Sequence, residues 1–280
     1  MKKKKKKISF KIILASAIFF CLLGGVAYFL IWSPFLWIEK IETKSDKEPR
    51  YYTQEEIREI IQNVLENKLY NLIPQKSIFF FSKREMQQNI LDRYPEIREV
   101  EISRQLPNSL EIQIQERENV GVWCQIEYFE TETTTSSPSI KQRKVKDCFN
   151  IDRDGVIYKE APLIESSFVL NIFGRKDKEI NIREQATTPQ IMSFILFAKE
   201  KLPEIKTTQD ISLSSVDFEV ISNEELRVKT NLGWEIYFNP AYSVESQLDT
   251  LDLVLNEQIK EELSNLEYID LRIQGRVYYK

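Results

Sequence analysis

A long stretch without charged residues near the N-terminus constrains this chain more than any other feature of its sequence. No charged side chain occurs between Lys11 and Glu39, and residues 12–32 are almost entirely apolar. About 20 apolar residues in a helix cross the hydrocarbon core of a bilayer. A cleaved signal peptide has a shorter apolar core followed by a small-residue cleavage motif, whereas Ala15-Ser16-Ala17 lies near the start of this run. The sequence therefore predicts an uncleaved transmembrane helix over residues 12–34.

The charges around this stretch predict its orientation. Seven lysines, at residues 2–7 and 11, precede it, and such a segment stays in the cytoplasm by the positive-inside rule. Residues 1–11 are thus expected to be a short cytoplasmic tail. A lysine run can also bind anionic lipid, but a topology signal is the favoured interpretation. Without these seven lysines, 32 of the 39 Lys and Arg residues remain against 43 Asp and Glu residues, which argues against nucleic acid or anionic lipid as a partner of the outer part.

Residues 35–118 predict a small domain with the element order β-α-α-β-β. An alternating apolar stretch leaves the membrane first, and two helical patterns follow. Each helix starts with a capping-box pair, Thr53 with Glu56 and Ser82 with Glu85. Two alternating strands then flank a Leu-Pro-Asn turn. Two helices on one side of a small sheet are therefore expected.

Residues 119–280 predict a second domain that is mostly β. Asp154-Gly155 and Leu232-Gly233 are turn signals between strand-like runs. Two amphipathic helices interrupt the strands, at residues 188–203 and 243–263. The whole chain is thus expected to be α+β: a single transmembrane helix, a small β-α-α-β-β domain, and a β-rich domain with a mostly antiparallel sheet and two helices.

Two cysteines in the second domain suggest a disulfide. Cys124 and Cys148 lie in strand-like stretches on either side of a polar Thr/Ser-rich segment at residues 130–140. If these stretches form an antiparallel pair centred near Ser136, the two cysteines fall opposite each other. Disulfides persist outside the cytoplasm, so a bridge is one hypothesis and two buried free thiols are the other.

Nothing in the sequence singles out an active site. The 43 Asp and Glu residues leave a carboxylate-pair hydrolase open by composition, but their spacing marks no pair. The chain has no histidine, which removes the commonest general base and metal ligand. None of its glycines forms a phosphate-binding loop. Asp152 and Asp154 could suggest calcium, but a calcium loop needs more oxygen ligands and a distal Glu, so a hairpin turn is the favoured interpretation. We therefore expect no enzymatic activity, no cofactor, no metal and no small-molecule substrate.

Three short patterns occur along the chain in a characteristic order and spacing. The stretch "SRQLPNSLEIQIQER" carries the first, at Arg104, Leu106, Pro107, Glu116 and Arg117. The second begins at a tryptophan and includes an Asp-x-x-Gly hairpin, at Trp123, Asp152, Gly155, Val156 and Tyr158. The third is "YIDLRIQGRVYYK", at Asp270, Leu271 and Arg272. Together, in this order and spacing, the three patterns resemble the FtsQ/DivIB cell-division family over essentially the whole chain. The Thr/Ser-rich insertion and the short basic tail depart from the family pattern.

The resemblance implies a non-enzymatic scaffold of the bacterial division complex. Its small domain would be of the POTRA type, and its expected partners are division-complex membrane proteins of the FtsB/DivIC and FtsL types. It implies a place at the mid-cell septum and a role in supporting septal peptidoglycan synthesis. The rivals are a POTRA-bearing component of another membrane assembly or translocation machine, and a membrane-anchored enzyme.

The C-terminal residues alternate like a strand that runs to the last residue. An exposed strand edge can be extended by a strand of a partner. We therefore predict a partner-binding strand that comprises Leu271, Arg272, Ile273, Gln274, Gly275, Arg276, Val277 and Tyr278. Asp270 and Arg272 are expected to form an ion pair on one face. The alternative is a packed sheet edge without a partner.

Overall fold

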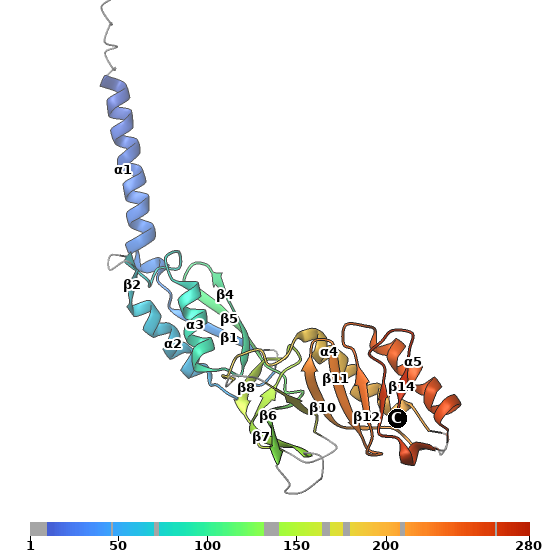
Figure 1. The fold of residues 1–280 in the computed structure, drawn as a ribbon. Coiled ribbons are helices and arrows are strands. Elements are labelled where there is room, and N and C mark those ends of the chain that lie inside the picture. The colour runs from blue at the N-terminus through green and yellow to red at the C-terminus, as the bar shows by residue number, and fades with distance from the viewer. Residues whose placement is uncertain are drawn as a thin grey trace, which may run out of the picture. The chain divides into compact units, whose positions relative to one another are not determined.

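The computed structural model describes residues 10–45, 47–69, 73–131, 140–163, 169–175, 180–207, 211–260 and 262–280. The chain divides into two compact units, Met1–Arg117 and Glu118–Lys280, and each is described by itself. Figure 1 shows the order of their elements along the chain.

The first unit begins with the helix α1 (Phe10–Trp32). Its segment Leu14–Trp32 has a mean hydropathy of 2.3 and none of it is buried, so it has the length and composition of a membrane span. A 3₁₀ turn, Pro34–Leu36, follows at once, and its Leu36 is buried. The expected single transmembrane helix is supported.

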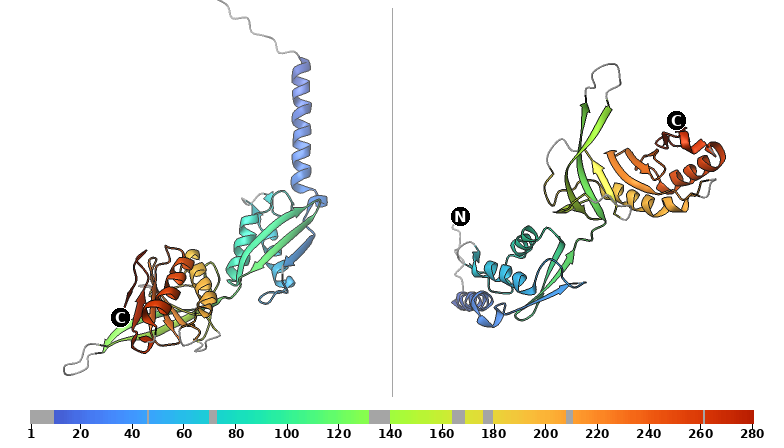
Figure 2. Two further views of the ribbon diagram at one scale, coloured as in Figure 1. Left: turned by 90° about the vertical axis from the view of Figure 1, so that its right-hand side faces the viewer. Right: turned by 90° about the horizontal axis from the view of Figure 1, so that it is seen from below.

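The rest of the first unit is a small sheet covered by two helices, and the predicted β-α-α-β-β order is confirmed. In its described residues the strands β1 (Lys40–Ser45), β5 (Ser109–Glu116) and β4 (Ile97–Gln105) lie in this order, with β1 parallel to β5. The helices α2 (Gln54–Glu66) and α3 (Lys83–Arg93) lie on one face (Figure 2). Alternate strand residues face these helices and pack against their apolar sides. The resulting core includes Ile57, Ile61, Met86, Ile90, Leu110 and Ile112. A short pair, β2 (Lys68–Leu69) and β3 (Ile73–Pro74), was not predicted.

The second unit is built on one large mixed sheet. Its described strands have the order β14-β13-β12-β11-β10-β9-β6-β7-β8. Their bounds are β6 (Gly121–Thr131), β7 (Ile140–Ile151), β8 (Ile157–Glu160), β9 (Asn171–Gly174), β10 (Ser215–Ser222), β11 (Glu225–Thr230), β12 (Glu235–Phe238), β13 (Tyr268–Asp270) and β14 (Tyr278–Tyr279). Neighbours are antiparallel except at β6–β9, β9–β10 and β12–β13. The expected mostly antiparallel sheet is confirmed, and the three parallel contacts are new.

Two helices, α4 (Pro189–Lys201) and α5 (Val244–Val254), cover this sheet (Figures 1 and 2). Alternation along the strands sends one set of side chains into the core beneath the helices. That core includes Phe194, Phe218, Trp234, Ile236, Phe238 and Leu251. Of the predicted helix over residues 243–263, the α-helical part ends at Val254. A π-helical turn, Leu255–Ile259, follows it directly, and Lys260, with φ 50°, ends the helical segment. A continuous helix to residue 263 is therefore wrong.

Candidate partner-binding site

The two ends of the nine-stranded sheet differ in what covers them. At the β8 end, the chain covers its own edge: the Ile157 N–H donates to the Glu184 carbonyl (3.1 Å), and the Arg183 N–H donates to the Ile157 carbonyl (2.7 Å). At the other end, β14 is the last strand in the sheet order of the described residues. In the described residues, β14 is therefore an open edge of this sheet, and an open edge exposes unpaired backbone groups.

Backbone hydrogen bonds show which residue of β14 faces outward. Tyr268 and Lys280 exchange two bonds, at 3.3 and 3.2 Å, and Ile269 lies opposite Tyr279. Positions of an antiparallel pair alternate between hydrogen-bonded and non-hydrogen-bonded. Tyr279 therefore directs its N–H and C=O away from β13, toward the open edge. The side chains of Tyr278 and Tyr279 are also exposed.

The predicted strand over residues 271–277 is wrong, because these residues form a turn between β13 and β14. Gly275 has φ +75°, and the Arg276 N–H donates to the Ile273 carbonyl (3.1 Å). Leu271 belongs to the core: its N–H donates to the Tyr237 carbonyl (2.8 Å) and its side chain is buried. Ile273, Gln274, Gly275 and Arg276 are exposed in the turn, Val277 packs partly on the core, and Tyr278 lies in β14. Partner binding by these residues stays a prediction.

A small hollow lies between this turn and the start of α5. Its volume is about 270 Å³, and its lining includes Tyr242, Ser246 and Thr250 from one side and Ile273 and Arg276 from the other. Tyr242 and Ile273 are 43% and 51% exposed, so two large side chains at this hollow are open to solvent, beside mostly polar neighbours. Sequence analysis missed Tyr242, because nothing in its local pattern links it to the turn.

A group of stacked aromatic and charged side chains joins the last strands on the face opposite the helices. We call it the Tyr237 cluster, and it comprises Tyr237, Tyr268, Arg227, Arg272, Glu225 and Asp270. The rings of Tyr237 and Tyr268 stack with centroids 5.2 Å apart. The guanidinium groups of Arg227 and Arg272 lie 4.7 and 5.4 Å from the centroid of the Tyr237 ring, within the range of cation–π attraction.

The expected same-face contact between Asp270 and Arg272 is present in this cluster. Two nitrogens of Arg272, Nε and Nη2, donate to the carboxylate at 2.9 and 2.6 Å. Burial acts to raise the pKa of Asp270, but hydrogen bonds from the side chain and backbone N–H of Arg272 outweigh it, so this pKa is lowered. Arg272 also pairs with Glu225 on β11. The guanidinium therefore links the C-terminal turn to a strand two places away in the sheet.

Replacing Asp270 by asparagine should weaken the second unit in a pH-dependent way. Because the folded-state pKa lies below the ordinary value of 3.8, the carboxylate contributes stability that is fully present above 3.8 and is lost as the pH falls through the lower, folded-state value. We expect Asp270→Asn to reduce the free energy of unfolding by about 1–2 kcal/mol at pH 7. Urea unfolding at several pH values should show the difference from the parent closing below about pH 4.

The matched control for this prediction is Asp249→Asn, on the exposed side of α5. We expect this change to alter the free energy of unfolding by less than about 0.5 kcal/mol at any pH. A loss in Asp270→Asn that stayed constant down to the acid range would contradict the assigned role of the carboxylate.

Cys124 and Cys148 occupy opposite positions of the β6–β7 ladder, and their sulfur atoms are joined. Both side chains are buried. Most of the Thr/Ser-rich segment at residues 130–140 lies outside the described residues. In the described residues, no three His, Cys, Asp or Glu side chains could hold a metal ion. The Asp152 carboxylate instead accepts the N–H groups of Asp154 and Val156, at 3.0 and 2.9 Å, as the turn interpretation predicts.

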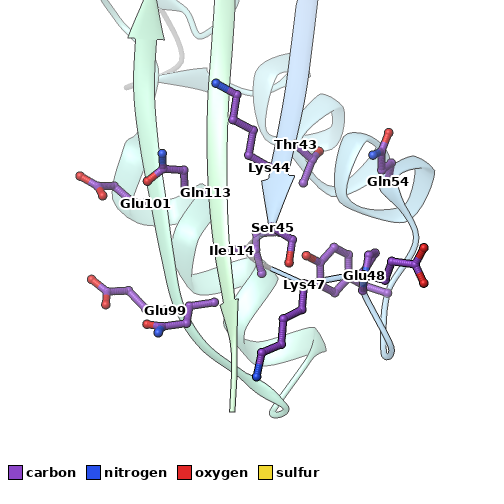
Figure 3. Close-up of a pocket in the computed structure, with 13 residues that line it drawn as sticks. Thr43, Lys44, Ser45, Lys47, Glu48, Gln54, Glu99, Glu101, Gln113 and Ile114 are labelled. Carbon is purple, nitrogen blue, oxygen red and sulfur yellow. The ribbon is translucent and has the colours of Figure 1, made fainter. Parts of the chain in front are cut away.

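The first unit has a larger hollow, of about 830 Å³, at the strand faces and the loop after β1. Figure 3 shows Glu99 and Glu101 from β4, Gln113 from β5 and Lys44 from β1 beside it. Lys44 pairs with Glu111 at 2.8 Å, and the hydrogen bond between them raises the pKa of Lys44. The lining is mostly polar and also includes Ser45, Lys47 and Tyr52.

Comparison with known proteins gives two matches. Residues 47–117 match the family model described as "POTRA domain, FtsQ-type". The protein "Cell division protein DivIB" of Clostridium botulinum (strain Loch Maree / Type A3) is 23% identical over 288 residues, which cover 100% of this chain and 94% of that protein. The first unit thus contains a POTRA domain, and the similarity to a division protein extends over both units.

Proposed function

We propose that this chain, which belongs to the FtsQ/DivIB family of cell-division proteins, is a non-enzymatic scaffold that gathers other membrane proteins of the division complex. It is a membrane protein with a POTRA domain and one candidate transmembrane helix. Its proposed partners are of the FtsB/DivIC and FtsL types, and by holding them it supports septal peptidoglycan synthesis. The full-length similarity to a DivIB protein is the observation that carries this proposal.

The β14 edge is the proposed contact, and its geometry supports strand addition. Tyr279 offers one outward N–H and one outward C=O, as derived from the ladder with β13. A partner strand paired there would gain main-chain hydrogen bonds, and side-chain pockets beside it would select the partner sequence. We propose that the same partner also contacts the hollow between Tyr242 and Ile273, which is lined by the turn that precedes β14.

The orientation and location follow from the charge pattern and the family. We propose that the seven lysines at residues 2–7 and 11 stay on the cytoplasmic side, that the POTRA domain and the β-rich unit lie outside, and that the chain gathers at the mid-cell septum. Fluorescence microscopy of a chain tagged at its N-terminus tests the location. An even distribution over the membrane of dividing cells would contradict it.

Replacing Tyr279 by proline tests strand addition by removing one backbone N–H group of β14. Proline removes one N–H, and at Tyr279 this N–H points outward, so the bonds to β13 remain. We expect co-purification of the full chain with its FtsB/DivIC-type and FtsL-type partners, expressed together in membranes, to fall at least tenfold, roughly the 1.4 kcal/mol expected for a lost interfacial hydrogen bond.

The matched control is Tyr279→Ala, which removes the side chain and keeps the N–H. We expect this variant to retain more of the partners than Tyr279→Pro does. Both variants should unfold in urea as the parent does, which shows that the sheet is intact. Full capture of both partners by a folded Tyr279→Pro chain would rule out strand addition at β14.

A further inference from the structure

The end of the POTRA domain next to α1 exposes apolar side chains that its core does not use. Phe35, Phe79 and Leu106 are 65%, 41% and 67% exposed. We call these three residues the membrane-proximal rim. They come from three separate segments: the turn after α1, the loop before α3, and the turn between β4 and β5. Exposed apolar residues gathered at one end of a domain are typical of a contact surface.

Hydrogen bonds attach two of these segments to the end of α1. The Ser77 hydroxyl donates to the Leu30 carbonyl in the last turns of the helix (2.9 Å). The Ile78 N–H donates to the Leu36 carbonyl (2.9 Å), and the Ile38 N–H donates to the Lys76 carbonyl (2.8 Å). Phe35 and Phe79 each adjoin one partner of the bond between Leu36 and Ile78. The loop before α3 is therefore held at the point where the chain leaves the helix.

The β4–β5 turn, which carries Leu106, is attached to the same place. The Asn108 carbonyl accepts the Glu39 N–H (2.9 Å), just before β1 begins to pair with β5. The Arg104 Nε donates to the Ile78 carbonyl (2.8 Å). Leu106 thus projects from a turn that is tied to both of the other segments, and the three rim residues belong to one end of one unit.

The neighbouring side chains suit the boundary between lipid and water. Tyr28 and Trp32, in the last turns of α1, stack with centroids 5.5 Å apart and are both exposed. Tyr and Trp gather at the headgroup level of membranes. Lys76, which precedes Ser77 in the chain, is also exposed, and its ammonium lies 6.0 Å from the centroid of the Trp37 ring. A basic group at this depth can contact lipid phosphates.

From this placement we propose that the membrane-proximal rim inserts into the headgroup–acyl boundary of the leaflet that surrounds the C-terminal end of α1. Apolar faces that bind in this way penetrate about 5–10 Å, which an exposed Phe or Leu on a turn can reach. The lipid is the favoured occupant because the rim is continuous with the end of the membrane-spanning helix. The insertion would fix the tilt of the POTRA domain on the membrane. It depends on α1 crossing the bilayer and not on the partners proposed above.

Spin labels on the rim test this insertion in the full chain. In a Cys21→Ala background, the joined Cys124 and Cys148 leave no other free thiol. Single cysteines are introduced by the substitutions Phe79→Cys and Leu106→Cys, and each is labelled with a nitroxide. The labelled chain is reconstituted in vesicles of phosphatidylcholine and phosphatidylglycerol at a ratio of about 3:1. This mixture has an anionic surface of the kind that attracts basic groups. The readout is the accessibility of each label to oxygen, which enriches in lipid, relative to a water-soluble nickel chelate.

The matched control is Gln113→Cys, on the exposed polar face of β5 and about 13 Å along the strand from Ser109. We expect both rim labels to show a several-fold higher ratio of oxygen to nickel accessibility than the control label. Rim labels that are as open to the nickel chelate as the control would overturn the proposal. Labels shielded from both reagents would overturn it as well, because they would indicate a protein contact, such as a second copy of the chain.

Discussion

Replacing Gly155 by alanine is expected to reduce the free energy of unfolding of the second unit by about 3 kcal/mol, from backbone strain and steric overlap together. Gly155 has φ +79°, and a Cβ placed there would lie 2.1 Å from the carbonyl oxygen of Thr187. The backbone cannot move away easily, because the Ala186 N–H donates to the Gly155 carbonyl (2.8 Å). Urea unfolding of the detergent-solubilised chain, followed by tryptophan fluorescence, measures the loss.

Gly233→Ala separates the two causes of this loss. Gly233 also lies in a hairpin turn with positive φ, at +94°, but no atom lies within 4 Å of the position that a Cβ would take there. Only the backbone strain remains, so we expect a loss of about 1 kcal/mol. Equal losses in the two variants would contradict the steric contact between residue 155 and Thr187.

Breaking the bond between Cys124 and Cys148 is expected to have an effect of similar size. The two cysteines are 24 residues apart, and closing a loop of this length reduces the entropy of the unfolded chain by the equivalent of about 3 kcal/mol. Reduction with dithiothreitol should lower the free energy of unfolding of the second unit by this amount, measured in urea as above. The cysteines are buried, so equilibration with the reductant should be carried out in denaturant.

The double variant Cys124→Ala, Cys148→Ala is the control for this effect. It should unfold with reduced stability in both the presence and absence of dithiothreitol, whereas the parent should respond to the reductant. A parent chain whose unfolding is unchanged by complete reduction would show that the bond contributes nothing to stability.

Local signals in the sequence predicted the elements of the first unit well. The second predicted capping box, at α3, is an exception, because only half of it forms. At α2 both halves of the box form: Thr53 Oγ1 accepts the Glu56 N–H (3.3 Å), and the Glu56 carboxylate accepts the Thr53 N–H (2.8 Å). At α3 the Ser82 hydroxyl caps the helix, but its N–H donates to the Gln75 side chain (2.9 Å). Gln75, from the preceding loop, thus replaces Glu85 as the acceptor of the Ser82 N–H. No sequence pattern within the helix predicts this replacement.

The end of α5 differs from the prediction for a reason of helix geometry. The core residues Leu251, Leu255, Ile259 and Leu263 follow one another at intervals of four. In an α-helix each such step rotates the side chain by about 40° around the axis. A wider π-helical turn over Leu255–Ile259 counteracts this rotation and keeps the row on the core. The periodicity predicted a helical segment correctly, but it could not predict the change of helix type.

The candidate site was only partly predictable because its residues come from strands far apart in the sequence. Asp270 and Arg272 are two residues apart, so alternation alone placed them on one face. Their companions Glu225 and Tyr237 lie on β11 and β12, and only the sheet order brings them together. The turn at residues 271–277 has the sequence pattern of a strand because its apolar residues alternate, although Leu271 and Val277 contact the core from a turn.

The strand β9 lies on the path that a mechanical load would take across the second unit. It is parallel to both neighbours, with four register pairs to β6 and three to β10, and parallel ladders are slightly weaker per residue. A force applied at β14 and resisted where the chain enters β6 acts across the sheet, perpendicular to the strands. It is therefore carried by the hydrogen bonds of these short ladders. The β13–β14 ladder, with two register pairs, and the parallel β12–β13 ladder, with three, lie on the same path and are no longer than those of β9. Tension applied at β14 is therefore expected to detach the C-terminal strands before the longer β6–β7 hairpin opens.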